Sequence, residues 1–481
     1  MRTRGDILLI SCYELGHQPF HLASLGATFR QAGYLPIYVD TAVATLSDET
    51  IKQARFVAIS VPMHTALRLG EQIAQRVRSV NPQAHICMYG LYALLNADHL
   101  LEKTIDSAVG GEYEIPLLKL IQALEQGEQL SIPGVRTRDV ASGPWIQRTP
   151  FLIPERKSLP ALSRYARLQW GDEWRVAGYT EATRGCKHTC LHCPVTPIYN
   201  GRFFAVPVEI VLTDIRTQVK RGACHITFGD PDFFNGPTHA MRIARTLHQE
   251  FPDVTFDATI KIEHLLKNRH LLHELRALGC IFVVSAVESL NDTVLAHLEK
   301  GHTSTDVAEA FELMEQANIS LRPSLLPFSP WETLDSYSAL LNFFEQHHFI
   351  EHIDSVHLSI RLLVPPGSAL LDRPDTGAWL GELDPSAYTY RWQHPDPQMD
   401  ALHQQVAVLV EQAATCEADT IDTFFRIKAL THAVRRLDFS VEQAMQEYGQ
   451  RKILPHLSES WFCCAEPTTN QLVPQLRSQA Q

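Results

Sequence analysis

The stretch Cys186-Lys-His-Thr-Cys190-Leu-His-Cys193 places three cysteines within eight positions of this 481-residue chain. One loop of that length can aim three thiolates at a single point. Thiolates are soft ligands, which select iron–sulfur clusters, zinc or copper(I) over hard cations. A closed structural zinc site takes four ligands, usually as two separated pairs, and no second pair follows at zinc-finger distance. A [4Fe-4S] cluster held by Cys186, Cys190 and Cys193 instead keeps one iron open for an outside ligand.

The C-x3-C-x2-C spacing of these cysteines resembles the signature of the radical S-adenosylmethionine (SAM) superfamily. In that family the open iron binds the amino and carboxylate groups of SAM, and an electron from the cluster cleaves a carbon–sulfur bond of the sulfonium. The resemblance therefore implies a [4Fe-4S] cluster, SAM and an electron donor of the flavodoxin or ferredoxin type. Two other interpretations stay open, namely a zinc site completed by His188 or His192, and a redox dithiol.

The composition is that of a soluble globular protein, with 45% hydrophobic and 20% charged residues, and the length predicts two or three domains. The net charge of -12 argues against a nucleic-acid-binding surface, which is normally basic. No apolar run of about 18 residues occurs, and the N-terminus lacks a signal-peptide core, so we expect no contact with a membrane. Ten cysteines, three of them clustered, favour a reducing cytoplasm over a disulfide framework.

Residues 1–128 alternate short apolar runs with helical periods, which predicts a doubly wound parallel sheet with ligand sites at the carboxyl ends of its strands. The arrangement resembles the cobalamin-binding domain found before many radical SAM cores, for example at Gly110-Gly111-Glu112-Tyr113-Glu114. The D-x-H-x-x-G segment of other cobalamin proteins is missing, and we interpret His17 and His21 as hydrogen-bonded loop residues. Many radical SAM relatives bind cobalamin without that histidine, so the sequence leaves cobalamin binding open.

Residues 129–175 are rich in Pro, Arg and Ser and predict an ordered linker. Residues 176–371 contain about six strand–helix units, from a strand at 176–182 to one at 355–362. This repeat predicts a partial (βα)6 TIM barrel with its active site on the loops after the strands. The radical SAM core has that shape, and the cysteine loop follows the first strand as the family would have it.

The loops after later barrel strands resemble the SAM contacts of the family. Gly229-Asp230-Pro231-Asp232 resembles the G-G-E position that holds the SAM amino group, with Asp230 favoured over Asp232. Ser285-Ala-Val-Glu288-Ser289 resembles a phrase of cobalamin-type radical SAM enzymes, in which Ser285 and Glu288 contact the SAM ribose or carboxylate. Turn or helix capping by these residues is the other interpretation. Lys261 and Arg322 are the candidates to pair with the SAM carboxylate, and the planar fork of Arg322 suits it better.

Residues 372–481 predict a helical C-terminal domain, after a Pro- and Asp-rich connection at 372–400. Its tail contains Cys463 and Cys464 in the phrase Cys-Cys-Ala-Glu-Pro. In the cytoplasm two adjacent cysteines are either an incidental dithiol or a soft-ligand site. The phrase resembles the mark of the CUAEP/CCAEP-tail radical SAM proteins. Relatives of that architecture are associated with arsinothricin biosynthesis, in which a 3-amino-3-carboxypropyl group of SAM is joined to trivalent arsenic.

These features predict a cytoplasmic radical SAM transferase for a small-molecule substrate. The leading hypothesis makes Cys463 and Cys464 catalytic residues that hold arsenic(III), supplied as arsenite, while the aminocarboxypropyl group is transferred to it. The alternative is a cobalamin-dependent methyltransferase that acts on carbon or phosphorus, which the N-terminal domain indicates. A non-catalytic metalloid or iron–sulfur sensor is disfavoured, because the set of SAM-binding residues is complete.

Overall fold

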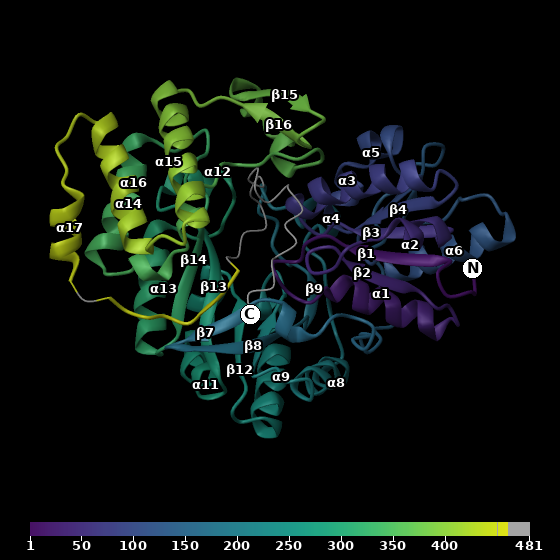
Figure 1. The fold of residues 1–481 in the computed structure, drawn as a ribbon. Coiled ribbons are helices and arrows are strands. Elements are labelled where there is room, and N and C mark those ends of the chain that lie inside the picture. The colour runs from purple at the N-terminus through teal and green to yellow at the C-terminus, as the bar shows by residue number, and fades with distance from the viewer. Residues whose placement is uncertain (450, 460–481) are drawn as a thin grey trace.

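The N-terminal part of the chain is a doubly wound α/β unit in the computed structural model, which describes residues 1–449 and 451–459 (Figure 1). Its sheet has the order β2-β1-β3-β4-β5-β6, with β1 to β5 parallel and β6 antiparallel. The strands are β1 (Ile7–Ser11), β2 (Ile37–Asp40), β3 (Phe56–Ser60), β4 (His85–Tyr89), β5 (Ser107–Val109) and β6 (Val135–Arg136). Strand order reverses between β1 and β3, and sheets of this kind bind ligands beyond such a switch point.

Helices cover both faces of this sheet, so its strands are buried and apolar on both sides. One core includes Leu25 and Leu120 under α1 and α6, and the other includes Leu67 and Leu100 under α3 and α5. The helices are α1 (Phe20–Gln31), α2 (Asp48–Gln53), α3 (His64–Val80), α4 (Leu91–Leu95), α5 (Ala97–Lys103) and α6 (Glu114–Gln126). This architecture confirms the predicted doubly wound sheet.

A curled sheet forms the second unit, drawn in teal and green (Figure 1). Its order is β14-β13-β12-β11-β8-β7-β17, with parallel pairing from β8 to β14 and antiparallel pairing of β7 and β17 at one edge. The strands are β7 (Arg167–Trp170), β8 (Glu173–Thr180), β11 (His225–Phe228), β12 (Thr255–Thr259), β13 (Cys280–Glu288), β14 (Ser320–Leu325) and β17 (His456–Leu457). The helices between the parallel strands are α8 (Val208–Val219), α9 (Pro237–Glu250), α10 (Ile262–Lys267), α11 (Leu272–Ala277), α12 (Asp292–His297) and α13 (Ser304–Gln316), and α14 (Leu334–Gln346) follows β14. The predicted α/β half-barrel is confirmed.

The sixth predicted barrel strand, at 355–362, is wrong in detail. The chain there forms the short 3-10 helix η5 (Ser355–Leu358) and joins the sheet through one parallel bridge, between Phe328 and Arg361. Pro365-Pro366 follows closely and offers no amide hydrogens, so a longer ladder has no donors there.

The C-terminal region packs on the half-barrel through α15 (Pro397–Thr415), α16 (Thr420–Val434) and α17 (Val441–Tyr448). The connection predicted at 372–400 contains a hairpin of β15 (Leu380–Asp384) and β16 (Thr389–Trp392). Trp379 and Trp392 are buried against the half-barrel and hold this hairpin in place. The domain boundaries near 128, 175 and 371 stay predictions.

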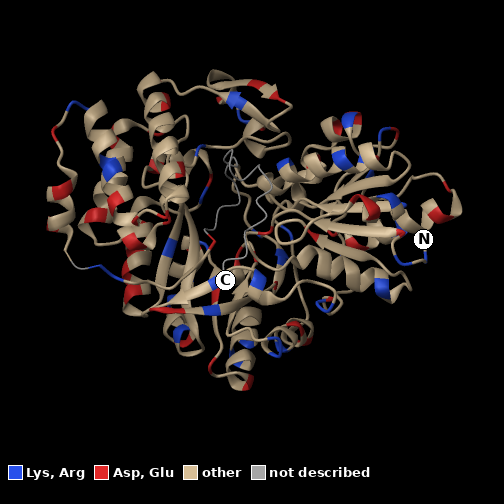
Figure 2. Cartoon of the chain, in the orientation of Figure 1, with Lys and Arg blue, Asp and Glu red and all other residues tan. Residues whose placement is uncertain are grey.

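None of the described helices is both long and apolar enough to cross a membrane. Lys and Arg are interspersed with Asp and Glu along both units, in keeping with the balance of charges in the sequence (Figure 2).

Candidate active site

The cysteine loop begins just beyond the carboxyl end of β8. It follows the short strand β9 (Thr183–Gly185), which pairs with β10 (Phe203–Ala205), and it leads into α7 (Thr196–Tyr199). The Lys187 amide donates to Asn235 Oδ1 at 3.1 Å, and the Leu191 amide donates to Leu298 O at 3.0 Å. The loop is therefore fastened on two sides by the half-barrel.

Three thiols, those of Cys186, Cys190 and Cys193, lie on this loop in buried or half-buried positions. Burial raises the pKa of Cys186 to about 12, so this thiol stays protonated until a metal displaces the proton. The Thr196 hydroxyl donates to Cys190 O at 2.8 Å and closes the turn. Three thiols on one fixed loop suit a cluster that keeps an open iron. Their role as cluster ligands stays a prediction.

Gly229 and Asp230 shape the loop after β11. A Cβ at Gly229 would lie 1.8 Å from the Tyr179 hydroxyl, so only glycine lets β8 and β11 approach here. Asp230 is buried and accepts from the Ala182 amide at 2.9 Å and from Thr183 Oγ1 at 2.6 Å. Burial raises the pKa of Asp230 to about 7. These bonds hold the chain just before the cysteine loop, and a SAM contact of Asp230 stays a prediction.

Asp232 faces two histidines. His264 Nδ1 lies 2.6 Å from Asp232 Oδ2, and His188 Nε2 lies 3.5 Å from the same oxygen. Burial would raise the pKa of Asp232, but the two histidines hold it below its ordinary value, so the carboxylate is ionised. Asp232 Oδ1 accepts from the Phe234 amide at 3.0 Å and caps the following turn.

Glu288 is buried between a lysine and a histidine next to the cysteine loop. Lys300 Nζ donates to Glu288 Oε1 at 3.1 Å, and His192 Nε2 lies 3.1 Å from the same oxygen. Burial would raise the pKa of Glu288, but Lys300 and His192 hold it well below its usual range. Its backbone φ of 67° is in the left-handed region, which a non-glycine residue adopts only when its surroundings enforce it. Glu288 therefore links the end of β13 to the cysteine loop.

The remaining predicted contacts occupy different environments. Lys261 Nζ lies 3.2 Å from His188 Nδ1, beside the cysteine loop. Arg322 forms an ion pair with Asp354. Ser285 is buried, and its hydroxyl has no hydrogen-bond partner among the described residues. The structure thus brings Lys261, Asp232 and Glu288 near the cysteine loop, whereas Arg322 is already engaged.

A buried arginine joins the two α/β units. Arg184, two residues before Cys186, contacts Glu114 Oε1 at 2.6 Å, Glu181 Oε2 at 3.1 Å and Glu112 Oε2 at 3.3 Å. Burial would lower the pKa of Arg184, but these carboxylates and Tyr113 hold it well above its usual value. The phrase that resembles the cobalamin-binding family therefore anchors the cysteine loop to the N-terminal sheet.

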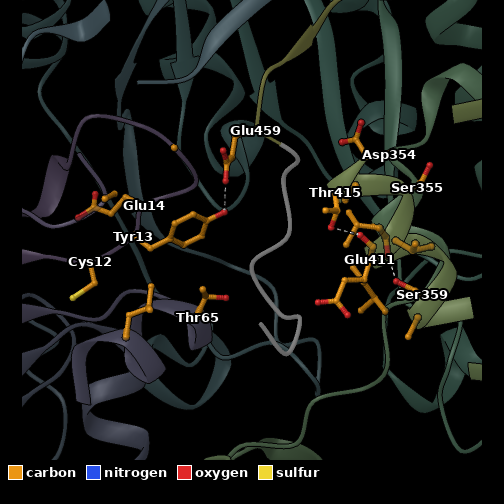
Figure 3. A pocket seen from close by; sticks show the side chains of 18 of the residues that line it. Cys12, Tyr13, Glu14, Thr65, Asp354, Ser355, Ser359, Glu411, Thr415 and Glu459 are labelled. Carbon is orange, nitrogen blue, oxygen red and sulfur yellow. Dashed lines mark hydrogen bonds between the residues drawn. The ribbon is translucent and has the colours of Figure 1, made fainter. Parts of the chain in front are cut away.

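A cavity of about 2160 Å³ lies between the N-terminal sheet, the half-barrel and α15. Figure 3 shows Cys12, Tyr13, Glu14 and Thr65 on one wall, and a set of side chains on the opposite wall. That second set contains Asp354, Ser355, Ser359, Glu411 and Thr415. The cavity therefore reaches the carboxyl end of β1, at the switch point of the N-terminal sheet.

His17 lies at the edge of this cavity, with its ring 4.7 Å from that of Tyr179. Burial lowers the pKa of His17 to about 4. His21 contacts Glu14 Oε2 at 3.2 Å. His17 lies in the loop before α1, as predicted, whereas His21 is hydrogen-bonded but lies in the first turn of α1. The predicted catalytic residues Cys463 and Cys464 lie outside the described residues.

Sequence reasoning missed three residues of this region. His264 follows Lys261 by three positions on α10, so the pattern K-x-x-H after a barrel strand was an available signal. Lys300 lies in a polar stretch, Glu299-Lys300-Gly301-His302, so the sequence gives no sign that it is buried, and buried lysines need a partner. Arg184 precedes the cysteines directly, but its partners come from more than 60 residues away in the case of Glu112 and Glu114.

Comparison with known proteins matches residues 180–343 to the radical SAM superfamily. An uncharacterized methyltransferase of Pyrococcus horikoshii is 22% identical over 356 residues, which are 71% of this chain and 74% of that protein. The solved structure of the cobalamin-dependent S-adenosylmethionine radical enzyme OxsB has a TM-score of 0.68 at 15% identity and covers 92% of this chain and 74% of OxsB.

The radical S-adenosylmethionine methyltransferase TsrM from Kitasatospora setae has a TM-score of 0.56 at 17% identity and covers 71% of each chain. At sequence identities of 15% and 17%, the similarity to these solved structures shows that the folds are alike. The matched residues 180–343 form most of the half-barrel that carries the three-cysteine loop, and this similarity to the radical SAM superfamily supports an enzyme whose cofactors are a [4Fe-4S] cluster and SAM.

Proposed function

We propose that this enzyme is a transferase that cleaves SAM at a cluster held by Cys186, Cys190 and Cys193 and moves a SAM-derived group to a small molecule in the interdomain cavity. The three thiols on the fixed cysteine loop carry the proposal. The cavity supports it, because its volume of about 2160 Å³ exceeds the roughly 300–1,000 Å³ of a pocket for one drug-sized ligand. It has room for a substrate together with a second large group. A bound cluster supplies the electron that breaks the carbon–sulfur bond of SAM.

The residues around the cysteine loop suit SAM, a cosubstrate that carries positive and negative charges. We assign the SAM carboxylate to Lys261, because Arg322 is already paired with Asp354. The unpartnered hydroxyl of Ser285 is the kind of buried polar atom that a bound ligand satisfies. We assign the SAM amino group to the backbone of the loop 229–232 and to Asp230, the carboxyl group that the sequence favours over Asp232.

Cobalamin-dependent methyl transfer is the first candidate for the reaction. Its support is the fold likeness to OxsB and TsrM and the methyltransferase relative. The cavity fits a corrinoid by volume and by its place at the carboxyl ends of β1 and β2. Near β5 the space is closed, since a Cβ at Gly110 or Gly111 would lie 2.7 Å from Leu94 or 2.5 Å from Trp145 O. The residues therefore fit this cofactor on the β1 side, where it would supply a methyl carrier.

Transfer of a 3-amino-3-carboxypropyl group to arsenic(III) is the second candidate. Its support is the tail phrase around Cys463 and Cys464 and the course of the chain that leads to it. After β17, Glu459 lines the cavity and accepts a hydrogen bond from the Tyr13 hydroxyl at 3.0 Å. The described chain thus ends at the cavity wall, four positions before Cys463. Trivalent arsenic is thiophilic, so adjacent cysteines suit it as a soft ligand pair.

The two candidates differ in which bond of SAM breaks, and this difference can be measured. The full chain is reconstituted anaerobically and given SAM and dithionite, with or without hydroxocobalamin and with or without arsenite. Methyl transfer predicts cobalamin-dependent S-adenosylhomocysteine. Aminocarboxypropyl transfer predicts arsenite-dependent methylthioadenosine. Absence of any SAM cleavage by a fully cluster-loaded chain would contradict the transferase proposal as a whole.

A cysteine variant separates acceptor binding from SAM cleavage. If the tail holds the acceptor, Cys464→Ser keeps the iron content and SAM cleavage of the parent but lowers the product formed per SAM consumed. Cys416→Ser is the matched control, because Cys416 is an exposed cysteine of the same region. Equal coupling in both variants would remove the tail from the reaction.

A further inference from the structure

Three side chains beside the cysteine loop converge on one point from separate segments of the half-barrel. His188 belongs to the cysteine loop, Asp232 to the loop after β11, and His264 to α10. One ring nitrogen of each histidine and one carboxylate oxygen all lie within 4.8 Å of one another. Asp232 and His264 are each 1% exposed, so solvent water has little access to these atoms as a hydrogen-bond partner.

The contacts within this trio are not those of a satisfied hydrogen-bond network. His264 Nδ1 is 2.6 Å from Asp232 Oδ2, and His188 Nε2 is 3.5 Å from it. None of these three atoms has a hydrogen-bond partner among the described residues, and neither has His264 Nε2. A short distance with an unsuitable angle means that the ring nitrogens do not aim at the oxygen. Buried polar atoms without partners are rare, and each one calls for an explanation.

The donor set has the chemistry of a metal site. Two imidazoles and one carboxylate are ligands that zinc and iron(II) accept, and a catalytic zinc site uses three protein ligands of these types. Ligands about 2.1 Å from a tetrahedral ion lie about 3.4 Å from one another. The 3.5 Å contact already has that spacing, and the 2.6 Å contact has to open by less than about 1 Å.

We propose that His188, Asp232 and His264 bind one divalent ion of the zinc and iron(II) class, distinct from the iron–sulfur cluster. Three protein ligands leave a tetrahedral ion one open position for water or another ligand. The ion fastens the cysteine loop to the β11 loop and to α10, and it adds positive charge beside Cys186 and Cys190. The site does not depend on which SAM-derived group the enzyme transfers.

Two neighbours of His188 have opposite effects on the affinity of the proposed site for the metal ion. Glu263 Oε2 lies 3.8 Å from His188 Nδ1, where it can accept the ring hydrogen once Nε2 binds the metal. Lys261 Nζ lies 3.2 Å from the same Nδ1, and a hydrogen bond from Lys261 favours the tautomer with hydrogen on Nε2. Glu263 therefore supports metal binding, whereas Lys261 competes with it until it turns to Glu263, 3.4 Å away.

Zinc itself is the probe in the test. The cluster-loaded full chain is equilibrated with Zn²⁺, freed of unbound metal, and examined by elemental analysis and by X-ray absorption at the zinc edge. We expect one zinc per chain, with nitrogen and oxygen neighbours at about 2.0–2.1 Å. Sulfur neighbours alone, or no zinc retained above the level of a metal-free control, would overturn the proposal.

Variants identify the ligands. His264→Ala should weaken zinc binding at least about 100-fold. Loss of a residue that only hydrogen-bonds a metal ligand already lowers the affinity about 10- to 100-fold, and loss of a ligand should cost more. Asp232→Asn keeps the volume and the turn cap and serves as the second variant if His264→Ala does not fold. Glu263→Gln should weaken binding about tenfold, and Lys261→Met should strengthen it.

His225→Ala is the matched control, because His225 is a fully buried histidine that contacts an aspartate, Asp257, at 2.8 Å without a third ligand. We expect its zinc content to equal that of the parent chain. Equal zinc affinity in the parent, His264→Ala and Asp232→Asn would show that the trio is not the site.

Discussion

The carboxyl ends of the two parallel sheets differ in how their charges are balanced. At the half-barrel, Glu288 lies between Lys300 and His192, and Asp232 lies between two histidines. At the N-terminal sheet, burial raises the pKa of Asp40, the last residue of β2, from its ordinary value near 3.8 to about 7. Burial likewise raises the pKa of Cys12. The half-barrel thus has an ion-paired edge, whereas the β1–β2 end of the N-terminal sheet, called the neutral edge below, carries two side chains, Asp40 and Cys12, whose uncharged forms burial favours.

This difference matches the kinds of ligand that each edge suits. SAM carries charges of both signs, and paired side chains can exchange partners with it at little electrostatic cost. A neutral, polar edge beside a large cavity suits a bulky group that carries little charge. Shared topology therefore does not decide the chemistry of a site, which comes from particular side chains.

The largest expected effect comes from replacing one cysteine at each edge and comparing the two variants. Cys190→Ser should reduce bound iron and reductive SAM cleavage to the level of an enzyme-free control, because the cluster loses a protein ligand. Cys12→Ser, at the buried end of β1, should change neither quantity. Iron content and 5′-deoxyadenosine plus methylthioadenosine formation after reconstitution measure both variants. Full cleavage activity in Cys190→Ser would break the assignment of the cluster to the half-barrel edge.

The next largest effect tests the paired edge. Lys300→Met leaves Glu288 buried with His192 alone, and removal of one partner of a buried ion pair costs about 3–5 kcal/mol of unfolding free energy. Chemical denaturation of the cluster-free chain measures the cost. The double variant Glu288→Gln with Lys300→Met should cost much less than the sum of the single variants, since neither charge remains. Additive costs would mean that the two side chains do not act as a pair.

The features that were predictable from sequence are those encoded locally. The cysteine spacing and the alternation of apolar runs with helical periods identified the loop, both sheets and the helical C-terminal region. The strand predicted at 355–362 failed because its pairing depends on the neighbouring β14 segment and on Pro365-Pro366, not on its own apolar run.

The partners of charged residues were not predictable, because tertiary packing decides them. Arg322 pairs with Asp354, 32 positions later, and its contact with SAM stays a prediction. Lys300 carries no local mark of a site, and His264 has only its spacing from Lys261, yet each contacts a predicted residue. Arg184 acquires its role only when the N-terminal unit packs on the half-barrel.

Asp40 gives a pH test of the neutral edge. Its pKa is higher in the folded chain than in the unfolded chain, so the folded state binds more protons between about pH 4 and pH 7. Stability should therefore fall as pH rises through that window, by at most roughly 4 kcal/mol, because a tenfold change in proton affinity corresponds to about 1.4 kcal/mol. Asp40→Asn keeps the bond from the Ala42 amide and should be more stable than the parent at pH 8.

Unfolding of parent and variant by denaturant at pH 4, 6 and 8 measures this effect. We expect equal stabilities at pH 4 and a growing advantage of Asp40→Asn at higher pH. Parallel pH profiles would show that Asp40 is ionised in the folded chain, and the contrast between the two edges would then be lost.

The smallest effect concerns the wall where the described chain ends. Tyr13→Phe removes the hydrogen bond to Glu459 and should cost about 1 kcal/mol of stability. If the segment after Glu459 delivers the acceptor, the same loss should lower the product formed per SAM consumed by about fivefold, the factor that corresponds to 1 kcal/mol, with SAM cleavage unchanged. Gly16→Ala is a second way to disturb the position of Glu459, because the added Cβ would lie 2.9 Å from Glu459 Cβ and the φ of Gly16 is 71°. A drop in SAM cleavage itself would instead indicate that this wall serves the half-barrel edge, so that the two edges are coupled through Tyr13.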